Sequence, residues 1–278
     1  PWDHAGTRSP QSEFAGIKVG EASLVDLKRL HLEWYDWIMR GGERPGFLQD
    51  RVAYYVMGAD VWRYADSLDA ITANVQPLWL DSDGRATDPF HSGYLADRPG
   101  RGPPDAYRYD PRHHPLAELE CKIDHPLVDQ RLLYAATDRQ AIYHSAPFGR
   151  DPEVSGFFRL EAWIGIDQAD TDFEASVYVV GLDGTAMLLA SDAMRARYRL
   201  GLDSPELVNS PAPEQYVFEG FNFSSREIKA GERLRLVIGP VQSIYKQKNC
   251  NIGGDVSLEC ADGSNIVLVK IFHELGHA

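Results

Sequence analysis

Several features that define common protein classes are scarce or absent in these 278 residues. No apolar run approaches the roughly 20 residues that a membrane-spanning helix needs, so the sequence predicts no membrane span. Basic residues are outnumbered, since 28 Lys and Arg face 41 Asp and Glu, which gives a net charge of −13. Because proteins that bind the phosphate backbone of nucleic acids present a basic face, we expect no nucleic-acid partner.

Cysteine is also scarce. Cys121, Cys250 and Cys260 are odd in number and show no C-x-x-C spacing, so the sequence supports neither a disulfide framework nor a zinc ribbon. We expect three reduced or buried thiols. The alternative is one disulfide between Cys250 and Cys260 across a hairpin around Gly253 and Gly254.

One helix is predicted near the start of the chain. Apolar residues recur at helical spacing at Leu24, Leu27, Leu30, Trp34 and Ile38. Ser23 is the expected N-cap, with Asp26 three residues later, and Gly41-Gly42 ends the run. We expect this helix to pack one apolar stripe against a core.

From Val52 onwards the pattern is that of β-strands. Candidate strands span residues 52–57, 77–80, 141–145, 156–166, 173–180, 186–190, 216–223, 233–238 and 265–272. A tract rich in Gly, Pro, Asp and Arg at about 81–131 is predicted as a long surface excursion. Many strands separated by turns favour a β-sandwich or jelly roll, with Trp163 and Phe173 facing its core.

Several motifs together resemble one family. P-W-D-H-A-G-T (1–7), L-H-L-E-W-Y-D-W-I-M-R-G-G (30–42) and V-A-Y-Y-V-M-G-A-D-V-W-R-Y-A-D-S-L (52–68) are similar to the C-terminal half of the cocaine esterase / X-Pro dipeptidyl-peptidase family of serine hydrolases. Further matches are Y-D-P (109–111), D-Q-R (129–131), S-G-F-F-R-L-E-A-W (155–163), D-T-D-F (170–173), R-A-R-Y-R (195–199) and G-E-R-L-R-L-V-I (231–238). W-Y-D-W with V-M-G-x-x-x-W is specific at this spacing.

The resemblance implies a division of the chain. Residues 1–48 correspond to the last loop and helix of an α/β-hydrolase domain, and 49–278 to a jelly-roll (galactose-binding-like) β-sandwich that helps wall the acyl-binding pocket. His4 is then the catalytic general base. The chain contains no G-x-S-x-G and opens on P-W-D-H-A-G without an initiator Met, and such triads run in the order Ser, Asp, His. We therefore expect the Ser and the Asp on an upstream α/β-hydrolase domain.

That function is hydrolysis of acyl esters, amides or Xaa-Pro peptides, with a small-molecule or peptide substrate and no cofactor. The alternative is a non-catalytic β-sandwich module that binds carbohydrate or protein. Neither the acyl group, the oligomeric state nor the compartment is defined by the sequence.

A rival motif lies at the other end of the chain. His273-Glu274-Leu275-Gly276-His277 is an H-E-x-x-H, which on a helix places two His on one face to bind zinc. The preceding residues 265–272 are strand-like, however, and a strand would separate the two His by about 13 Å at ~3.3 Å per residue. Gly276 interrupts a helix, and no third ligand follows before Ala278. We expect a strand end with exposed His and no metal, and the metalloprotease is the alternative.

Other candidates have two interpretations each. Asp167, Asp170 and Asp172 form a solvated turn or, alternatively, a Ca²⁺ site. Trp34, Trp37, Trp62 and Trp79 are expected in the core first, and in a substrate pocket second. His113-His114 is expected to be exposed, and the role of the loop at 249–254 is not assigned.

Overall fold

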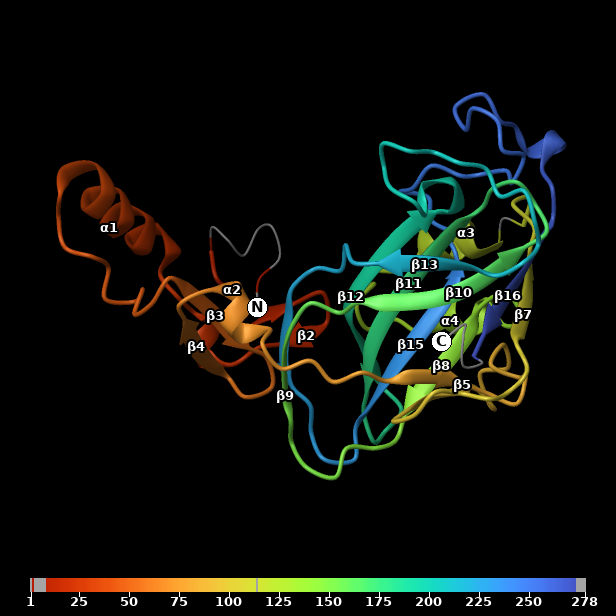
Figure 1. Ribbon diagram of the computed structural model, residues 1–278. Helices are drawn as coiled ribbons and strands as arrows, with labels where there is room; N and C mark the ends of the chain where they lie inside the picture. The colour runs from red at the N-terminus through yellow and green to blue at the C-terminus, as the bar shows by residue number, and fades with distance from the viewer. Residues whose placement is uncertain (1, 3–8, 114, 274–278) are drawn as a thin grey trace.

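The computed structural model describes residues 2, 9–113 and 115–273. The chain is mainly β, and most strands belong to two sheets that face each other as a sandwich (Figure 1). The larger sheet has the strand order β12-β11-β15-β8-β6-β5, and the smaller has the order β13-β10-β16-β7. Only the β6–β8 pairing within these two sheets is parallel in the described part of the chain.

The elements are as follows. The larger sheet contains β5 (Trp79–Asp81), β6 (Gly93–Ala96), β8 (Ala141–Ser145), β11 (Asp172–Val180), β12 (Ala186–Arg195) and β15 (Arg233–Pro240). The smaller contains β7 (Asp105–Tyr109), β10 (Leu160–Ile166), β13 (Glu214–Phe218) and β16 (Val267–Phe272). Three pairs lie apart: β1 (Glu13–Phe14) with β2 (Ile17–Lys18), β3 (Val52–Val56) with β4 (Val61–Ala65), and β9 (Glu153–Gly156) with β14 (Ser224–Glu227). The helices are α1 (Leu27–Arg40), α2 (Leu68–Ile71), α3 (Pro115–Glu120), α4 (Arg131–Ala135) and the 3-10 turns η1 (Glu21–Ser23), η2 (Ala196–Tyr198) and η3 (Ala261–Gly263).

The core lies between the two sheets. In β16 the sequence V-L-V-K-I-F alternates, so Val267, Val269 and Ile271 face inward and are buried. From the larger sheet, Phe173 meets Tyr216 of the smaller sheet edge to face, with ring centroids 5.2 Å apart. Burial of these apolar side chains is the main force that holds the sheets together.

One strand was expected to present Trp163 to this core. Phe173 is fully buried, as predicted, but Trp163 is only half-buried. It lies between Ala162 and Ile164, which face the core, and successive residues of a strand point to opposite faces. The prediction for Trp163 is therefore wrong.

The tract 81–131 is also not the continuous surface excursion that its composition predicts. It contains β6, β7 and α3, and β7 supplies Tyr107 and Tyr109 to the core. In β7 the sequence D-A-Y-R-Y alternates between buried and exposed residues. Proline, glycine and aspartate on both sides of this five-residue strand hid its short period.

Helix α1 has a capping residue at each end. Asp26 is its N-cap, with its carboxylate accepting a hydrogen bond from the Arg29 amide at 3.0 Å. Gly41 ends it with φ of 71°, a left-handed conformation that favours glycine. The predicted N-cap, Ser23, is wrong, because Ser23 lies buried in η1 and donates to the Gly20 carbonyl at 2.7 Å.

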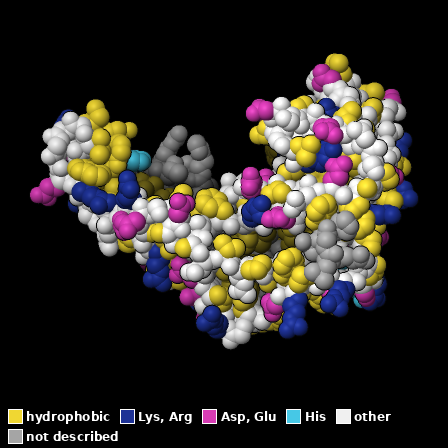
Figure 2. All heavy atoms as spheres, viewed as in Figure 1, with side chains coloured by type: hydrophobic (Ala, Val, Ile, Leu, Met, Phe, Trp, Pro, Cys, Tyr) yellow, Lys and Arg dark blue, Asp and Glu magenta, His cyan; other side chains and the backbone are white. Residues whose placement is uncertain are grey.

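Most of the apolar stripe predicted for α1 is not buried among the described residues. Only Leu27 of this helix is buried, while Trp34 and Ile38 of the stripe are 40% and 51% exposed. Figure 1 shows α1 standing apart from the sandwich, and Figure 2 shows hydrophobic side chains gathered on its surface. The four tryptophans first expected in the core are not fully buried either. Trp34 is exposed, and Trp37, Trp62 and Trp79 are half-buried.

Candidate functional site

His4, the predicted general base, lies outside the described residues, but Trp2, two positions before it, is described. The Trp2 indole Nε1–H donates a hydrogen bond to the Ser23 carbonyl at 2.8 Å. Its ring lies against that of Trp62, with centroids 5.9 Å apart and an interplanar angle of 41°. Trp2 is therefore held by both a hydrogen bond and an aromatic contact.

Trp62 lies on β4 at the centre of an aromatic cluster. Its own Nε1–H donates to the Ala22 carbonyl at 2.7 Å. Phe47 and Tyr55 pack edge-on against its ring, with centroids 4.9 and 5.7 Å away. Because each indole N–H has a partner and each ring has neighbours, the rotamers of both tryptophans are constrained.

Asp60, in the β3–β4 turn, is hydrogen-bonded to the segment whose carbonyls accept the two indole N–H groups. Its Oδ1 accepts from the Ala22 amide at 3.0 Å and from the Tyr55 hydroxyl at 2.8 Å. The Tyr55 oxygen in turn accepts from the Gly20 amide at 3.1 Å. Burial raises the pKa of Tyr55, so its hydroxyl keeps the proton that it donates.

The turn between β3 and β4 is joined to β14 at Met57. The Met57 amide donates to the Ser225 carbonyl at 3.1 Å, and its carbonyl accepts from the Glu227 amide at 2.8 Å. Gly58 follows with φ of 83°, and a Cβ there would lie 2.9 Å from the Glu227 carbonyl oxygen. Only glycine allows this conformation and this close approach without strain.

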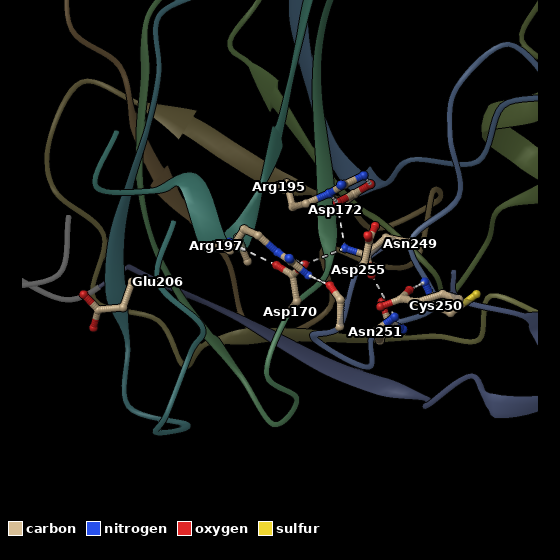
Figure 3. Close-up of polar contacts among 12 residues, drawn as sticks. Asp170, Asp172, Arg195, Arg197, Glu206, Asn249, Cys250, Asn251 and Asp255 are labelled. Carbon is tan, nitrogen blue, oxygen red and sulfur yellow. Dashed lines mark hydrogen bonds and ion pairs between the residues drawn. The ribbon is translucent and has the colours of Figure 1, made fainter. Parts of the chain in front are cut away.

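A second polar constellation lies at one end of the sandwich (Figure 3). The buried Asp170 carboxylate accepts from Arg197 Nε at 2.8 Å and from Asn249 Nδ2 at 3.0 Å. Asp172 pairs with Arg195 at 2.8 Å and also accepts from Asn249 at 2.9 Å. The motifs D-T-D-F and R-A-R-Y-R, distant in sequence, thus meet through the loop whose role the sequence left unassigned.

This arrangement corrects the prediction of a solvated turn at Asp170 and Asp172. Burial raises the pKa of Asp170 even though Arg197 and Asn249 donate to it. The Asp172 hydrogen bond raises the pKa of Arg195. Guanidinium groups hold these carboxylates, and no cluster of metal-binding side chains is present among the described residues, so nothing in that part of the chain favours the Ca²⁺ alternative.

An open cleft of about 660 Å³ lies beside this constellation. Its lining combines donors, acceptors and apolar groups: Arg195, Arg197, Tyr198, Pro205, Leu207, Gln247, Gly253, Gly254, Asp255, Val256 and Ser257. The volume lies within the range of about 300–1,000 Å³ that is common for ligand sites. The Arg197 guanidinium also donates to the Gly254 carbonyl at 2.8 Å, so much of its bonding capacity is used internally.

The first His of the H-E-x-x-H motif is buried, contrary to the expected exposure. His273 follows the end of β16, and its Nε2 lies 3.1 Å from Asp105 Oδ2 and 3.3 Å from the Tyr143 hydroxyl. The expected strand before it is confirmed, whereas His277 lies outside the described residues. His273 is buried because β16 ends beside Asp105, which the sequence placed in a surface tract.

The remaining candidates are the three cysteines and the histidine pair. Cys121, Cys250 and Cys260 are free thiols, and Cys250 alone of the three is buried. His113 is half-buried, not exposed, and His114 lies outside the described residues. Among the described residues, no helix has both the length and the apolar character that a membrane span requires.

The comparisons with known proteins agree with this architecture. Residues 46–245 match the family described as the X-Pro dipeptidyl-peptidase C-terminal non-catalytic domain. The chain is 25% identical to cocaine esterase of Rhodococcus sp. (strain MB1 Bresler) over 266 residues, which cover 93% of this chain and 46% of the esterase.

Two solved structures share the fold. An aminopeptidase from the marine sediment archaeon Thaumarchaeota archaeon has a TM-score of 0.82 and 16% identity, and the similarity covers 100% of this chain and 47% of that one. An α-amino acid ester hydrolase has a TM-score of 0.80 and 15% identity, and covers 98% and 47%.

The chain belongs to the X-Pro dipeptidyl-peptidase C-terminal domain family and corresponds to the C-terminal part of CocE/NonD hydrolases, as the motifs predict. It spans less than half the length of these relatives.

Proposed function

We propose that this chain is the C-terminal portion of a serine hydrolase that cleaves acyl esters, amides or Xaa-Pro peptides. Residues 1–48 supply the histidine loop and last helix of an α/β-hydrolase domain, and 49–278 form a jelly-roll (galactose-binding-like) sandwich that walls the substrate pocket. The observation that carries this proposal is the match over nearly the whole chain to cocaine esterase, of which it covers only 46%.

The chemistry divides between two parts of the protein. A Ser on the upstream domain attacks the acyl carbonyl, and His4 accepts the Ser proton and then passes it to the departing alcohol or amine. The upstream Asp orients the imidazole and stabilises its charged form. Water, deprotonated by His4, then attacks the acyl-enzyme and releases the acid and the free Ser.

Helix α1 supports the presence of an upstream partner. Leu32, Tyr35 and Met39 are exposed on a helix that buries only Leu27 within the described chain. A contiguous apolar patch of this kind marks an interaction site. We assign the patch to contact with the α/β-hydrolase domain.

The test uses the longer protein in which residues of this chain follow a catalytic domain with G-x-S-x-G. With p-nitrophenyl acetate as the substrate, His4→Ala is expected to lower kcat by roughly 10⁴-fold, since the members of a triad act as a unit. His125→Ala, at an exposed histidine outside α1, is the matched control and should leave kcat unchanged. Full activity in His4→Ala, or a reading frame that starts at Pro1, would refute the assignment.

The isolated chain is expected to be inert towards the same ester, because it has neither the nucleophilic Ser nor the Asp of the triad.

The second candidate function is a non-catalytic module that binds carbohydrate or protein, and the 660 Å³ cleft is the observation that favours it. Titration of the isolated chain with free monosaccharides, monitored by NMR, separates the two. Binding that is lost in Gln247→Ala would support the module.

A further inference from the structure

We propose that Trp2 and Trp62 form an indole clamp that positions His4, and that the β3–β4 hairpin is the element through which the sandwich holds the histidine loop. This inference rests on the proposed function, because the residue that is positioned is the general base assigned there. Trp2 and Trp62 are positioning residues in this scheme and take no part in the chemistry.

The clamp holds two consecutive carbonyl groups of one short segment. Trp62 donates its indole N–H to the Ala22 carbonyl at 2.7 Å, and Trp2 donates to the next carbonyl, that of Ser23, at 2.8 Å. The two rings meet with centroids 5.9 Å apart. Trp2 is thus fixed in position and orientation by Trp62 and by η1.

His4 is close in sequence to this fixed point. Two residues of chain span at most about 7 Å, so anchoring Trp2 restricts the space that His4 can reach. A general base must lie within hydrogen-bond reach of the proton that it removes. Misplacement by about 1 Å can cost a factor of 10² in rate, so an anchor at this distance has kinetic consequences.

The segment that the clamp grips is itself held firmly. Asp60 binds the Ala22 amide and the Tyr55 hydroxyl, and the Tyr55 oxygen accepts from the Gly20 amide. A Cβ at Gly20 would lie 1.9 Å from Asp60 Cγ, so glycine is required for this approach. The two indole N–H groups therefore bind a backbone segment that other hydrogen bonds already hold in place.

The β3–β4 hairpin is itself attached to the rest of the protein through β14. Met57 makes two backbone hydrogen bonds with β14, whose partner strand β9 leads toward β10 in the smaller sheet. Gly58 permits the turn against Glu227. The motif V-M-G-x-x-x-W thus has a physical meaning: Met57 attaches the hairpin to β14, Gly58 allows the close approach, and Trp62 contacts Trp2.

The experiment uses the longer, catalytically competent protein with p-nitrophenyl acetate. Trp62→Ala is expected to lower kcat by roughly 10- to 100-fold with a smaller effect on KM, and to shift the acid limb of the kcat–pH profile that reports the base. Trp62→Phe, which keeps an aromatic ring but loses the indole N–H, should recover part of the rate. Trp79→Ala, a half-buried tryptophan of the larger sheet, is the matched control.

A double-mutant cycle separates positioning from folding. In a His4→Ala background, Trp62→Ala should cause no further loss of kcat, because the residue through which it acts is gone. Equal losses in both backgrounds, or an unchanged kcat and pH profile in folded Trp62→Ala, would overturn the clamp. An unaffected His4→Ala variant would instead refute the proposed function, so the two failures are distinguishable.

Discussion

The buried carboxylate of Asp105 offers the sharpest test of how the two sheets are joined. Its oxygens accept from the Ser82 hydroxyl at 2.7 Å, the Ala86 amide at 2.9 Å and the Tyr143 hydroxyl at 2.9 Å, and His273 Nε2 lies 3.1 Å away. Asp105 belongs to the smaller sheet and Tyr143 to the larger. One side chain therefore links both sheets, a loop and the end of β16.

Asp105→Ala would leave these donors buried without their acceptor. Burial on its own raises the pKa of Asp105, but the donors outweigh it, with His273 the strongest, and the pKa is lowered. Removing one partner of a buried charged network costs about 3–5 kcal/mol. At about 2–4 °C per kcal/mol for a domain of this size, we expect Tm to fall by about 6–20 °C.

The assay is urea and thermal unfolding of Asp105→Ala beside Asp97→Ala, an exposed aspartate in the same tract that should change little. A lowered carboxyl pKa gives its full stabilisation above the pKa of the unfolded state, and this stabilisation is lost as the pH falls through the pKa of the folded state. The difference in unfolding free energy between wild type and Asp105→Ala should therefore narrow below about pH 4. A loss of stability below about 1 kcal/mol, at the level of a surface substitution, would refute the reasoning.

Three further outcomes are expected. Burial and the nearby Arg235 lower the pKa of His144 to about 4. The free energy of unfolding should therefore decline as the pH falls from about 6.5 toward 4, and His144→Gln should reduce that decline by up to about 2 kcal/mol in urea titrations. Asp170→Asn should destabilise by about 3 kcal/mol, because it removes the buried negative charge that pairs with Arg197, while the exposed Asp203→Asn should not, as thermal melts would show. Protein purified without an affinity tag should contain no stoichiometric zinc by metal analysis, and zinc lost on His273→Ala would contradict this.

The strongly patterned strands could be predicted from the sequence. The range 141–145 coincides with β8, and the ranges around β11, β15 and β16 differ from the structure by at most two residues at either end. These strands are buried on at least one face, so apolar and β-branched residues recur at the spacing of a strand. The single range 156–166 was too coarse, because β9 ends and β10 begins within it.

The site residues could be predicted only as motifs, because their meaning depends on partners far away in the chain. Asp170 and Arg197 are separated by 27 residues, and Asp170 and Asn249 by 79. No local pattern reports such pairs. For the same reason His273 was expected to be exposed, since its partner Asp105 belongs to a strand hidden among turn-forming residues.

The N-terminal segment has a stability problem that bears on the proposed function. An isolated helix of 14 residues is marginal in water, and α1 buries only Leu27 against the described chain. The hairpin next to it is different, because Met57 bonds it to β14 and Trp62 packs within an aromatic cluster. One side of this segment is therefore held by the sandwich, whereas α1 requires an apolar partner. On the proposed function that partner is the catalytic domain, so docking of α1 and the hydrogen bonds of Trp2 and Trp62 to residues 22–23 would together hold the segment that precedes β3.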